Sequence, residues 1–206
     1  MSVMGTVVSL PTSSFPPLAV GFMGLGTGYL IYGPQELFRY PRRDKQSVDF
    51  ATGLWGIFLP GFMQFFTGAY IFAGLVLFGT FTAKPLYMAG LAFTAYGVHW
   101  FVIGWSRLHG ADARTNLGMA IGFLLISILG MIAFFGSHDN PVGGLFIGLT
   151  GVYAADIVVS LKPNMPRAGD LAERVLGFFH LGTGLWLIYL MFAVTLNFVL
   201  GYNLPA

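Results

Sequence analysis

The chain has 206 residues, of which 56% are hydrophobic and only 9% are charged, and its formal net charge is +2. A soluble domain carries about 25% charged residues, so this composition excludes an ordinary water-exposed surface and indicates that much of the surface faces lipid. The basic residues form no continuous patch, which argues against a nucleic-acid partner. The absence of cysteine excludes disulfides, thiol catalysis and cysteine-ligated metal sites.

Six apolar stretches are each long enough to cross a bilayer as a helix, which takes about 20 residues. They cover residues 17–38, 51–79, 86–106, 115–136, 142–161 and 175–200. The segment IGFLLISILGMIAFF is apolar on all sides, whereas a barrel strand would alternate polar and apolar residues. The predicted fold class is therefore all-α, a polytopic membrane protein with six transmembrane helices. We expect one domain over residues 17–200, a short N-terminal arm over 1–16 and a C-terminal tail over 201–206.

Positive charge is concentrated in alternate connections between these stretches. Nine of the ten Lys and Arg residues lie in the first, third and fifth connections, and the remaining one, Lys84, lies in the second. Cytoplasmic loops of membrane proteins carry an excess of Lys and Arg, so these three connections are predicted to face the cytoplasm. Both termini would then lie outside.

Glycine and proline mark special places in the predicted helices. In a membrane, small residues indicate faces where helices approach closely. Two interpretations of the glycine clusters stay open: ordinary helix packing, or backbone that lines a narrow path because no side chain fills it. Pro60 lies inside the second stretch, where it removes a backbone hydrogen bond and predicts a bend. The glycines in question are Gly21, Gly24 and Gly28 in the first stretch and Gly182 and Gly184 in the sixth.

Ionisable residues at membrane depth are candidate functional residues, because charge is costly there. His99 follows Tyr96 by three residues, so the two share a helix face that should look into the protein. It is either a neutral histidine satisfied within the packing or a pore-lining group that binds a substrate oxygen or a proton. Asp156 either reaches the membrane interface or pairs with Lys162 or Arg174, or else it is a proton-binding carboxylate. His180, about one turn into the sixth stretch, is expected at the interface.

No motif indicates catalysis. The histidines do not have the spacing of metal ligands, and no nucleophile with a neighbouring base stands out. The GLGTG segment lies in an apolar helix with no strand before it, so it is no signal for a nucleotide. We therefore expect no enzyme, no cofactor and no metal, and a passage for a small solute is the favoured class.

Several motifs together resemble the acetate uptake transporter family, the acetate/succinate permeases of bacteria and fungi. Their order and spacing along most of the chain carry the resemblance. The family's signature of the first helix is similar to PPLAVGFMGLG, and its third-helix pattern is similar to FTAYGVHW. The second-helix pattern resembles GIFLPGFMQFFTG with Gln64 and Gly68, and the sixth resembles GLWLIYLMFAVTLN with Tyr189, Ala193 and Asn197. The fifth, FIGLTGVYA, matches more weakly.

The resemblance implies six transmembrane helices per protomer, a homo-hexamer in the lipid bilayer of a bacterial plasma membrane, and one pore in each protomer. It also implies a hydrophobic constriction made by one residue from each of the first, third and fifth helices. Position by position these are Leu25, Tyr96 and Leu149. The substrate would be a small carboxylic acid. The polar residues expected along its path, or along that of a proton, are Gln64, His99, Asp156 and Asn197.

Departures from the family pattern keep other functions open. The signature Asn of the first helix is Pro16, the usual Phe at the constriction is Leu25, and the Phe before the tryptophan of the third helix is His99. Termini on the outside also differ from the acetate permeases and are similar to the urea/amide channels. The favoured function is a transporter or channel for acetate or a similar short monocarboxylate, with or without a coupled proton. The alternatives are a channel for neutral small solutes such as urea, short amides or ammonia, and an accessory subunit of a membrane complex.

Overall fold

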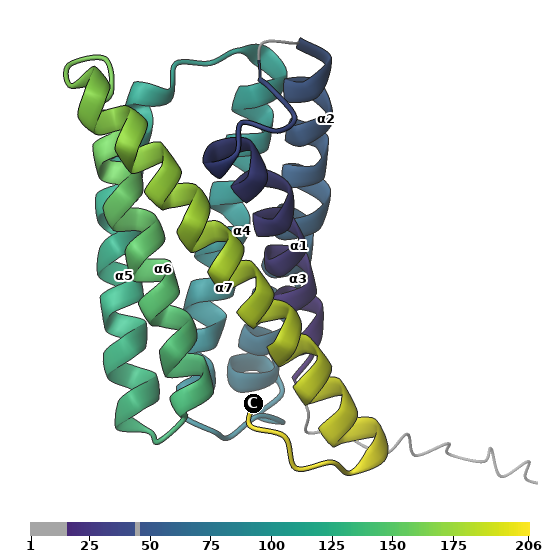
Figure 1. Cartoon of the computed structure of the whole chain (residues 1–206). Helices are drawn as coiled ribbons and strands as arrows, with labels where there is room; N and C mark the ends of the chain where they lie inside the picture. The colour runs from purple at the N-terminus through teal and green to yellow at the C-terminus, as the bar shows by residue number, and fades with distance from the viewer. Residues whose placement is uncertain (1–15, 44–45) are drawn as a thin grey trace, which may run out of the picture.

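The computed structural model describes residues 16–43 and 46–206, so the predicted arm over residues 1–16 lies outside the described residues except for its last position. The described chain is built from helices joined by short connections (Figure 1). In chain order the elements are α1 (Leu18–Leu37), α2 (Gln46–Gly56), η1 (Ile57–Gly61), α3 (Phe62–Phe72), η2 (Ala73–Leu77), α4 (Pro85–His109), η3 (Ala113–Thr115), α5 (Asn116–Gly136), α6 (Asn140–Ser160) and α7 (Pro166–Leu200).

The six predicted membrane spans are present. Residues 46–77, from α2 through η2, form one long helix, and this helix with α4, α5, α6 and α7 gives five helices long and apolar enough to cross a membrane. α1 runs beside them and is the sixth (Figure 1). Large apolar side chains such as Leu125 and Ile132 on α5 are exposed, as expected of a surface that contacts lipid. The chain is therefore an all-α polytopic membrane protein.

Two spans begin earlier than predicted, because charged residues at their ends are paired. The second starts at Gln46 and the sixth at Pro166, whereas the apolar pattern suggested residues 51 and 175. Asp49 in the added turn of α2 forms an ion pair with Arg107. Glu173 in the added turns of α7 forms one with Lys162. A hydropathy pattern detects only apolar residues. It therefore misses helical turns whose charged side chains are stabilised by ion pairs.

The bend predicted at Pro60 takes the form of a π-helical turn. Pro60 has no N–H to donate, and the helix loosens into the π segment η1 around it before returning to α-helix at Phe62. On the neighbouring helix, a Cβ on Gly28 would come within 2.7 Å of the Pro60 ring. A Cβ on Gly24 would come within 2.7 Å of the Leu59 carbonyl oxygen. The two glycines therefore let α1 lie directly against the widened turn.

Four of the five glycines singled out from the sequence lie on packing faces, and the fifth, Gly182, has open space beside it. A Cβ on Gly21 would lie 2.3 Å from the Phe93 ring, and one on Gly184 would lie 3.2 Å from the Gly26 carbonyl oxygen, so α1 meets both α4 and α7 closely. Among the described residues, none of the five glycines lines either of the two cavities described below, and Gly182 lines a separate cavity of about 200 Å³ between α6 and α7. The interpretation that backbone lines a path at these glycines is thus not supported.

All three basic connections lie at one end of the bundle. The α1–α2, α4–α5 and α6–α7 connections are together at the top of Figure 1, and the α3–α4 and α5–α6 connections and the C-terminus are at the bottom. Ion pairs join the connections to the helix ends: Arg43 contacts both Glu36 and Glu173, and Lys162 contacts Glu173. The end that holds the basic connections is called the inner end below, and the opposite end the outer end.

Candidate functional site: two cavities and a waist

The inner end of the bundle holds a cavity of about 700 Å³. It lies among α1, α4, α6 and α7, and its walls carry both basic and acidic side chains. Arg43, Arg107 and Lys162 line it together with Glu36, Asp156 and other acidic side chains. Because residues of all three basic connections contribute to the lining, the cavity reaches the inner surface.

The outer end holds a smaller cavity of about 200 Å³. It is lined mainly by apolar side chains of α1, α4 and α6, among them Phe22, Phe93 and Phe146. Two polar residues join the lining, Gln64 and Asp139. Asp139 also caps α6, where its Oδ1 accepts a hydrogen bond of 3.2 Å from the Val142 N–H. Burial raises the pKa of this carboxyl group.

The two cavities are separated by side chains at one level of the bundle. Leu25, Tyr96 and Leu149 line the outer cavity, and each is only 2% exposed. One turn further along the same helices, Tyr29, His99 and Val152 line the inner cavity. Residues three or four apart share a helix face, so one continuous face of α1, α4 and α6 runs from the first cavity to the second. We call Leu25, Tyr96 and Leu149 the waist.

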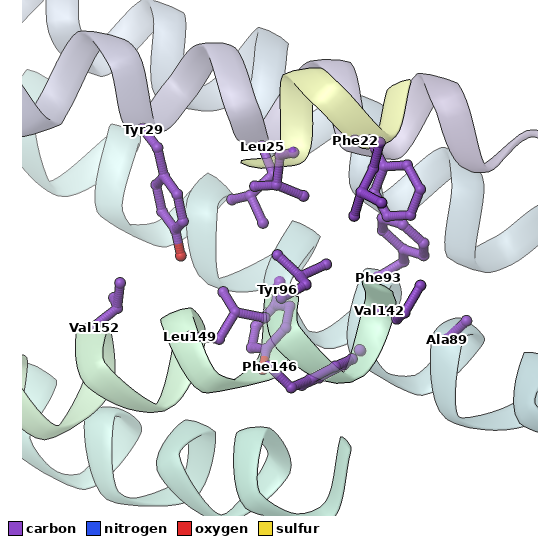
Figure 2. Packing of buried hydrophobic residues seen from close by; sticks show 14 of the residues in the cluster. Phe22, Leu25, Tyr29, Ala89, Phe93, Tyr96, Val142, Phe146, Leu149 and Val152 are labelled. Atoms are coloured by element: carbon purple, nitrogen blue, oxygen red, sulfur yellow. The ribbon is translucent and has the colours of Figure 1, made fainter. Parts of the chain in front are cut away.

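Figure 2 shows how the waist is built. Leu25 and Tyr29 of α1 point toward α6, Leu149 and Val152 of α6 point toward α1, and Tyr96 of α4 is drawn at the level of Leu149. All the side chains at this level point into the bundle and not toward lipid. The residues that the family resemblance suggested for a constriction are therefore brought together in the interior.

The hydroxyl group of Tyr96 is already engaged. It lies 3.0 Å from Ser127 Oγ on α5, and Ser127 itself donates to the Phe123 carbonyl oxygen at 2.8 Å. With the Ser127 proton used there, Tyr96 donates to Ser127. Its ring stacks on the Tyr153 ring, with centroids 5.7 Å apart. Tyr96 thus presents mainly its aromatic ring to the waist, and its hydroxyl proton is already donated to Ser127.

Gln64 is the most unusual polar group of the outer cavity. The side chain comes from α3, is 1% exposed and lines the cavity beside the waist. Neither its Nε2 nor its Oε1 has a hydrogen-bond partner among the described residues. A buried amide without partners costs free energy, so such a group is expected to serve a bound molecule or water.

His99 lies on the inner side of the waist, where it lines the large cavity. Its Nδ1 is 3.4 Å from the Tyr153 hydroxyl oxygen, a long contact, and its Nε2 is buried with no partner in the described part of the chain. The imidazole is therefore only half satisfied by the protein. This agrees better with a cavity-lining role than with a histidine fully satisfied within the packing.

The inner cavity also holds a pair that sequence reasoning missed. His180 Nδ1 lies 2.5 Å from Glu36 Oε2, and the two residues are 6% and 5% exposed. Glu36 lies inside the first predicted span, so the rule that selected His99 applied to it as well. His180 was expected at the membrane interface. In the structure, α7 begins at Pro166, which places His180 several turns into the helix, where it is buried against Tyr29 with ring centroids 4.4 Å apart.

The remaining predicted residues separate into two places. Asp156 lines the inner cavity, and the described residues give its side chain no ion pair or hydrogen bond, so the predicted pairing with Lys162 is absent. Lys162 contacts Asp170 and Glu173, which raise its pKa. Asn197 lies outside both large cavities and binds the C-terminal tail through two hydrogen bonds of 2.8 Å with Leu204. Its position supports an anchoring role and not a place on a solute path.

The described residues contain no group of three or more His, Asp or Glu side chains placed to hold a metal ion. The polar groups of the cavities can donate and accept hydrogen bonds and can exchange protons. The apolar waist between them can exclude hydrated ions.

A comparison with known proteins identifies a solved structure that has the same fold. No family model matches the chain, and no curated protein matches its sequence. The solved structure of the bacterial acetate channel SatP is similar, with a TM-score of 0.68 and 20% sequence identity over 93% of this chain and 98% of that chain. The two helical chains share nearly their whole length, so the protein described here has the fold of the bacterial acetate channel SatP.

Proposed function

We propose that this protein is a passage for acetate or another short monocarboxylic acid across a bacterial plasma membrane. The observation that carries the proposal is a pair of internal cavities of about 700 and 200 Å³ on the two sides of an apolar waist, within the fold of an acetate channel. The waist residues are Leu25, Tyr96 and Leu149, and the polar residues assigned to the solute path are Gln64, His99 and Asp156.

The apolar character of the waist favours the neutral form of such an acid. An ion that enters an apolar constriction must lose water without gaining equivalent hydrogen bonds, and this costs several kcal/mol even after relaxation. A protonated carboxylic acid has no net charge and loses much less. At the waist, Leu25 and Leu149 offer no polar atom, and the Tyr96 hydroxyl group is bound to Ser127. We infer that the solute crosses this level as the neutral acid.

A second candidate is a channel for neutral solutes such as urea or short amides. The observation that favours it is the free side-chain amide of Gln64, which offers both a donor and an acceptor in an apolar cavity. A primary amide or urea can pair with both atoms, and so can a protonated carboxylic acid. A carboxylate has only acceptor atoms and would leave Gln64 Oε1 unpaired. Gln64 therefore supports a neutral solute in either candidate.

We also propose that the protein assembles as a homo-hexamer in which each protomer keeps its own pore. What supports separate pores is that both cavities and the waist are formed by residues of one chain. Native mass spectrometry in detergent or nanodiscs tests the assembly. A homogeneous monomer would overturn it.

Flux into proteoliposomes tests the function. Radiolabelled acetate and urea are offered at equal concentration, at neutral and at acidic external pH, to vesicles with and without protein. For the acid passage we expect protein-dependent acetate flux that rises about tenfold for each unit of external acidification while the carboxylate is the dominant form. Urea flux would stay constant with pH.

The outcomes separate the candidates. Protein-dependent urea flux without acetate flux would favour the neutral-solute channel. Equal rates with and without protein for both solutes would overturn both candidates and favour the accessory subunit.

A further inference from the structure

The inner cavity holds a buried carboxylate–imidazole pair directly behind the waist. Glu36 of α1 and His180 of α7 meet at 2.5 Å, and both line the cavity. Tyr29, one turn after Leu25, places its ring against the His180 ring. A solute that leaves the waist on the inner side therefore enters the part of the cavity that Tyr29 and His180 line.

Holding α1 to α7 does not require such a pair. The two helices already meet through close glycine contacts, for example Gly26 with Gly184 and Gly33 with Gly177. A carboxylate that is only 5% exposed carries a desolvation cost, which a hydroxyl or amide side chain in its place would avoid. A function that uses the charge of the pair would explain why a carboxylate is buried at this position.

A second carboxylate faces the same space. Asp156 of α6 lines the cavity and has no ion pair or hydrogen bond in the described chain. Arg43 Nη2 lies 3.3 Å from Glu36 Oε1. With His180 neutral, the group formed by Arg43, Glu36 and Asp156 carries a net charge of −1, and one added proton brings it to zero. The cluster is thus able to accept one proton without leaving an uncompensated buried charge.

The other titratable and charged side chains that face this space come from every surrounding element. They are largely compensated among themselves: Arg107 pairs with Asp49, and Lys162 pairs with Glu173. Tyrosine and neutral histidine side chains add no charge. The full set besides the cluster is Tyr29 and Tyr32 of α1, Asp49 of α2, His99 and Arg107 of α4, Asp112 and Arg114 of the α4–α5 connection, Tyr153 of α6, Lys162 of the α6–α7 connection and Glu173 of α7.

We propose that Glu36, His180 and Asp156 form a proton-binding site in the inner cavity, which takes the proton that a neutral monocarboxylic acid carries through the waist. This inference rests on the proposed function. The O–H bond of the acid breaks, its electron pair stays on the acid oxygen, and the proton binds the His180 imidazole, whose positive charge Glu36 and Asp156 together compensate. The carboxylate product then leaves through the charged inner cavity, and the proton follows by transfer to water at its mouth.

The proposed site makes entry directional in a chemical sense. Once the acid has lost its proton, the anion faces an apolar waist that it crosses only at high cost. Return requires that the site give a proton back, so the return rate depends on the pH of the inner compartment. Without a proton-binding site in the cavity, the return rate would follow only the amount of neutral acid in the bulk solution.

The experiment measures exchange of labelled acetate out of proteoliposomes whose internal pH is varied while the concentration of neutral acid inside is held constant. The variants are Glu36→Gln, His180→Gln and Asp156→Asn, with the inner end of each population identified by protease protection. The matched controls are Asp170→Asn and His109→Gln, which change the same residue types outside the cavity. We expect wild type and controls to change rate about tenfold over the pH range in which the site titrates. We expect the three variants to stay constant within about twofold over that range.

Each outcome decides. A wild-type pH profile retained by all three variants, with acetate exchange intact, would overturn the proton-binding site and leave the acid passage standing. Absence of acetate exchange in wild type would overturn the acid passage and this inference together. Where Glu36→Gln does not yield a monodisperse protein, Asp156→Asn carries the test, because it breaks no contact of the described residues.

Discussion

The two cavities lie in line within one bundle but have opposite chemistry. The outer cavity, of about 200 Å³, is walled by aromatic and aliphatic side chains, and Gln64 is the buried polar group beside its inner limit. The inner cavity, of about 700 Å³, is lined by ion-paired side chains, two histidines and the carboxylate of Asp156, which has no ion pair among the described residues. The waist between them is thin, a single level of three side chains. Under the proposed function, this difference lets the outer end select a solute by the cost of removing water, and lets the inner end return it to a polar environment.

The contrast between the outer and inner cavities depends first on the waist, which must separate them on the path of the solute. Leu149→Trp adds bulk to the side chain that Figure 2 places opposite Leu25. We expect acetate flux to fall to the level of protein-free vesicles, because the new ring fills the remaining space between α1, α4 and α6. Radiolabelled acetate uptake measures this.

The matched control is Leu125→Trp on the exposed surface of α5, where the side chain is 61% accessible. The control should keep wild-type flux. Overpacking costs about 1–3 kcal/mol, so both variants are first compared by size-exclusion chromatography and thermal unfolding. A Leu149→Trp protein that folds and transports like wild type would remove the waist from the solute path.

A second prediction concerns the charge of the inner cavity. Glu36→Leu leaves His180 without its partner and removes one of the two carboxylates that contact Arg43. We expect a loss of about 3–5 kcal/mol in the free energy of unfolding, the usual cost of breaking a buried pair from one side. Glu36→Gln keeps a hydrogen bond to the imidazole and should lose less. Reversible unfolding in mixed micelles gives both values, and equal stability of the two variants would contradict the prediction.

A third and smaller effect tests the polar group of the outer cavity. Gln64→Leu removes the unpartnered amide from that cavity and leaves Asp139 as the remaining polar residue named in its lining. If Gln64 binds the solute through one net hydrogen bond worth about 1 kcal/mol, the apparent affinity for the neutral solute falls about fivefold. Concentration-dependent flux measures it. Thr67→Val, a buried change on the same helix outside the cavity, serves as the control, and an equal effect of both substitutions would assign the loss to packing.

The smallest predicted effect lies at the inner rim. Lys162 is 39% exposed and bound to Asp170 and Glu173, which raise its pKa. A raised pKa means that the pairing stabilises the fold below the ordinary lysine value of about 10.4 and that this contribution is lost as the pH rises through the folded-state pKa. After allowance for solvent screening, Lys162→Met should cost under about 1 kcal/mol at neutral pH. The difference from wild type should shrink in strongly alkaline buffer, and a difference that grows there would contradict the assignment.

Much of the fold could be predicted from hydropathy, because each span in lipid must be long, apolar and helical. The two errors of span length came from turns whose charges are paired, at Asp49 and Glu173. A hydropathy pattern reports each residue alone, and the partners Arg107 and Lys162 come from other parts of the chain.

The candidate site was predicted less completely. Leu25, Tyr96 and Leu149 followed from the family resemblance, and their meeting in the interior agrees with it. Glu36 was missed because its partner, His180, is 144 residues away in sequence and only the crossing of α1 and α7 brings them together. Asn197 was assigned to the solute path because an amide in an apolar helix needs hydrogen-bond partners. The sequence does not tell whether a solute or the chain itself supplies them, and here Leu204 does.

The anchored tail has a practical consequence for topology mapping. Asn197 holds Leu204 through two hydrogen bonds, and the Tyr189 hydroxyl group donates to the Pro205 carbonyl oxygen at 2.9 Å. A reporter enzyme fused after Ala206 would thus emerge from a fixed point at the end of the bundle that lacks the basic connections. Fusions with one reporter active only in the periplasm and another fluorescent only in the cytosol would read out the sidedness of the molecule in living cells, without purification.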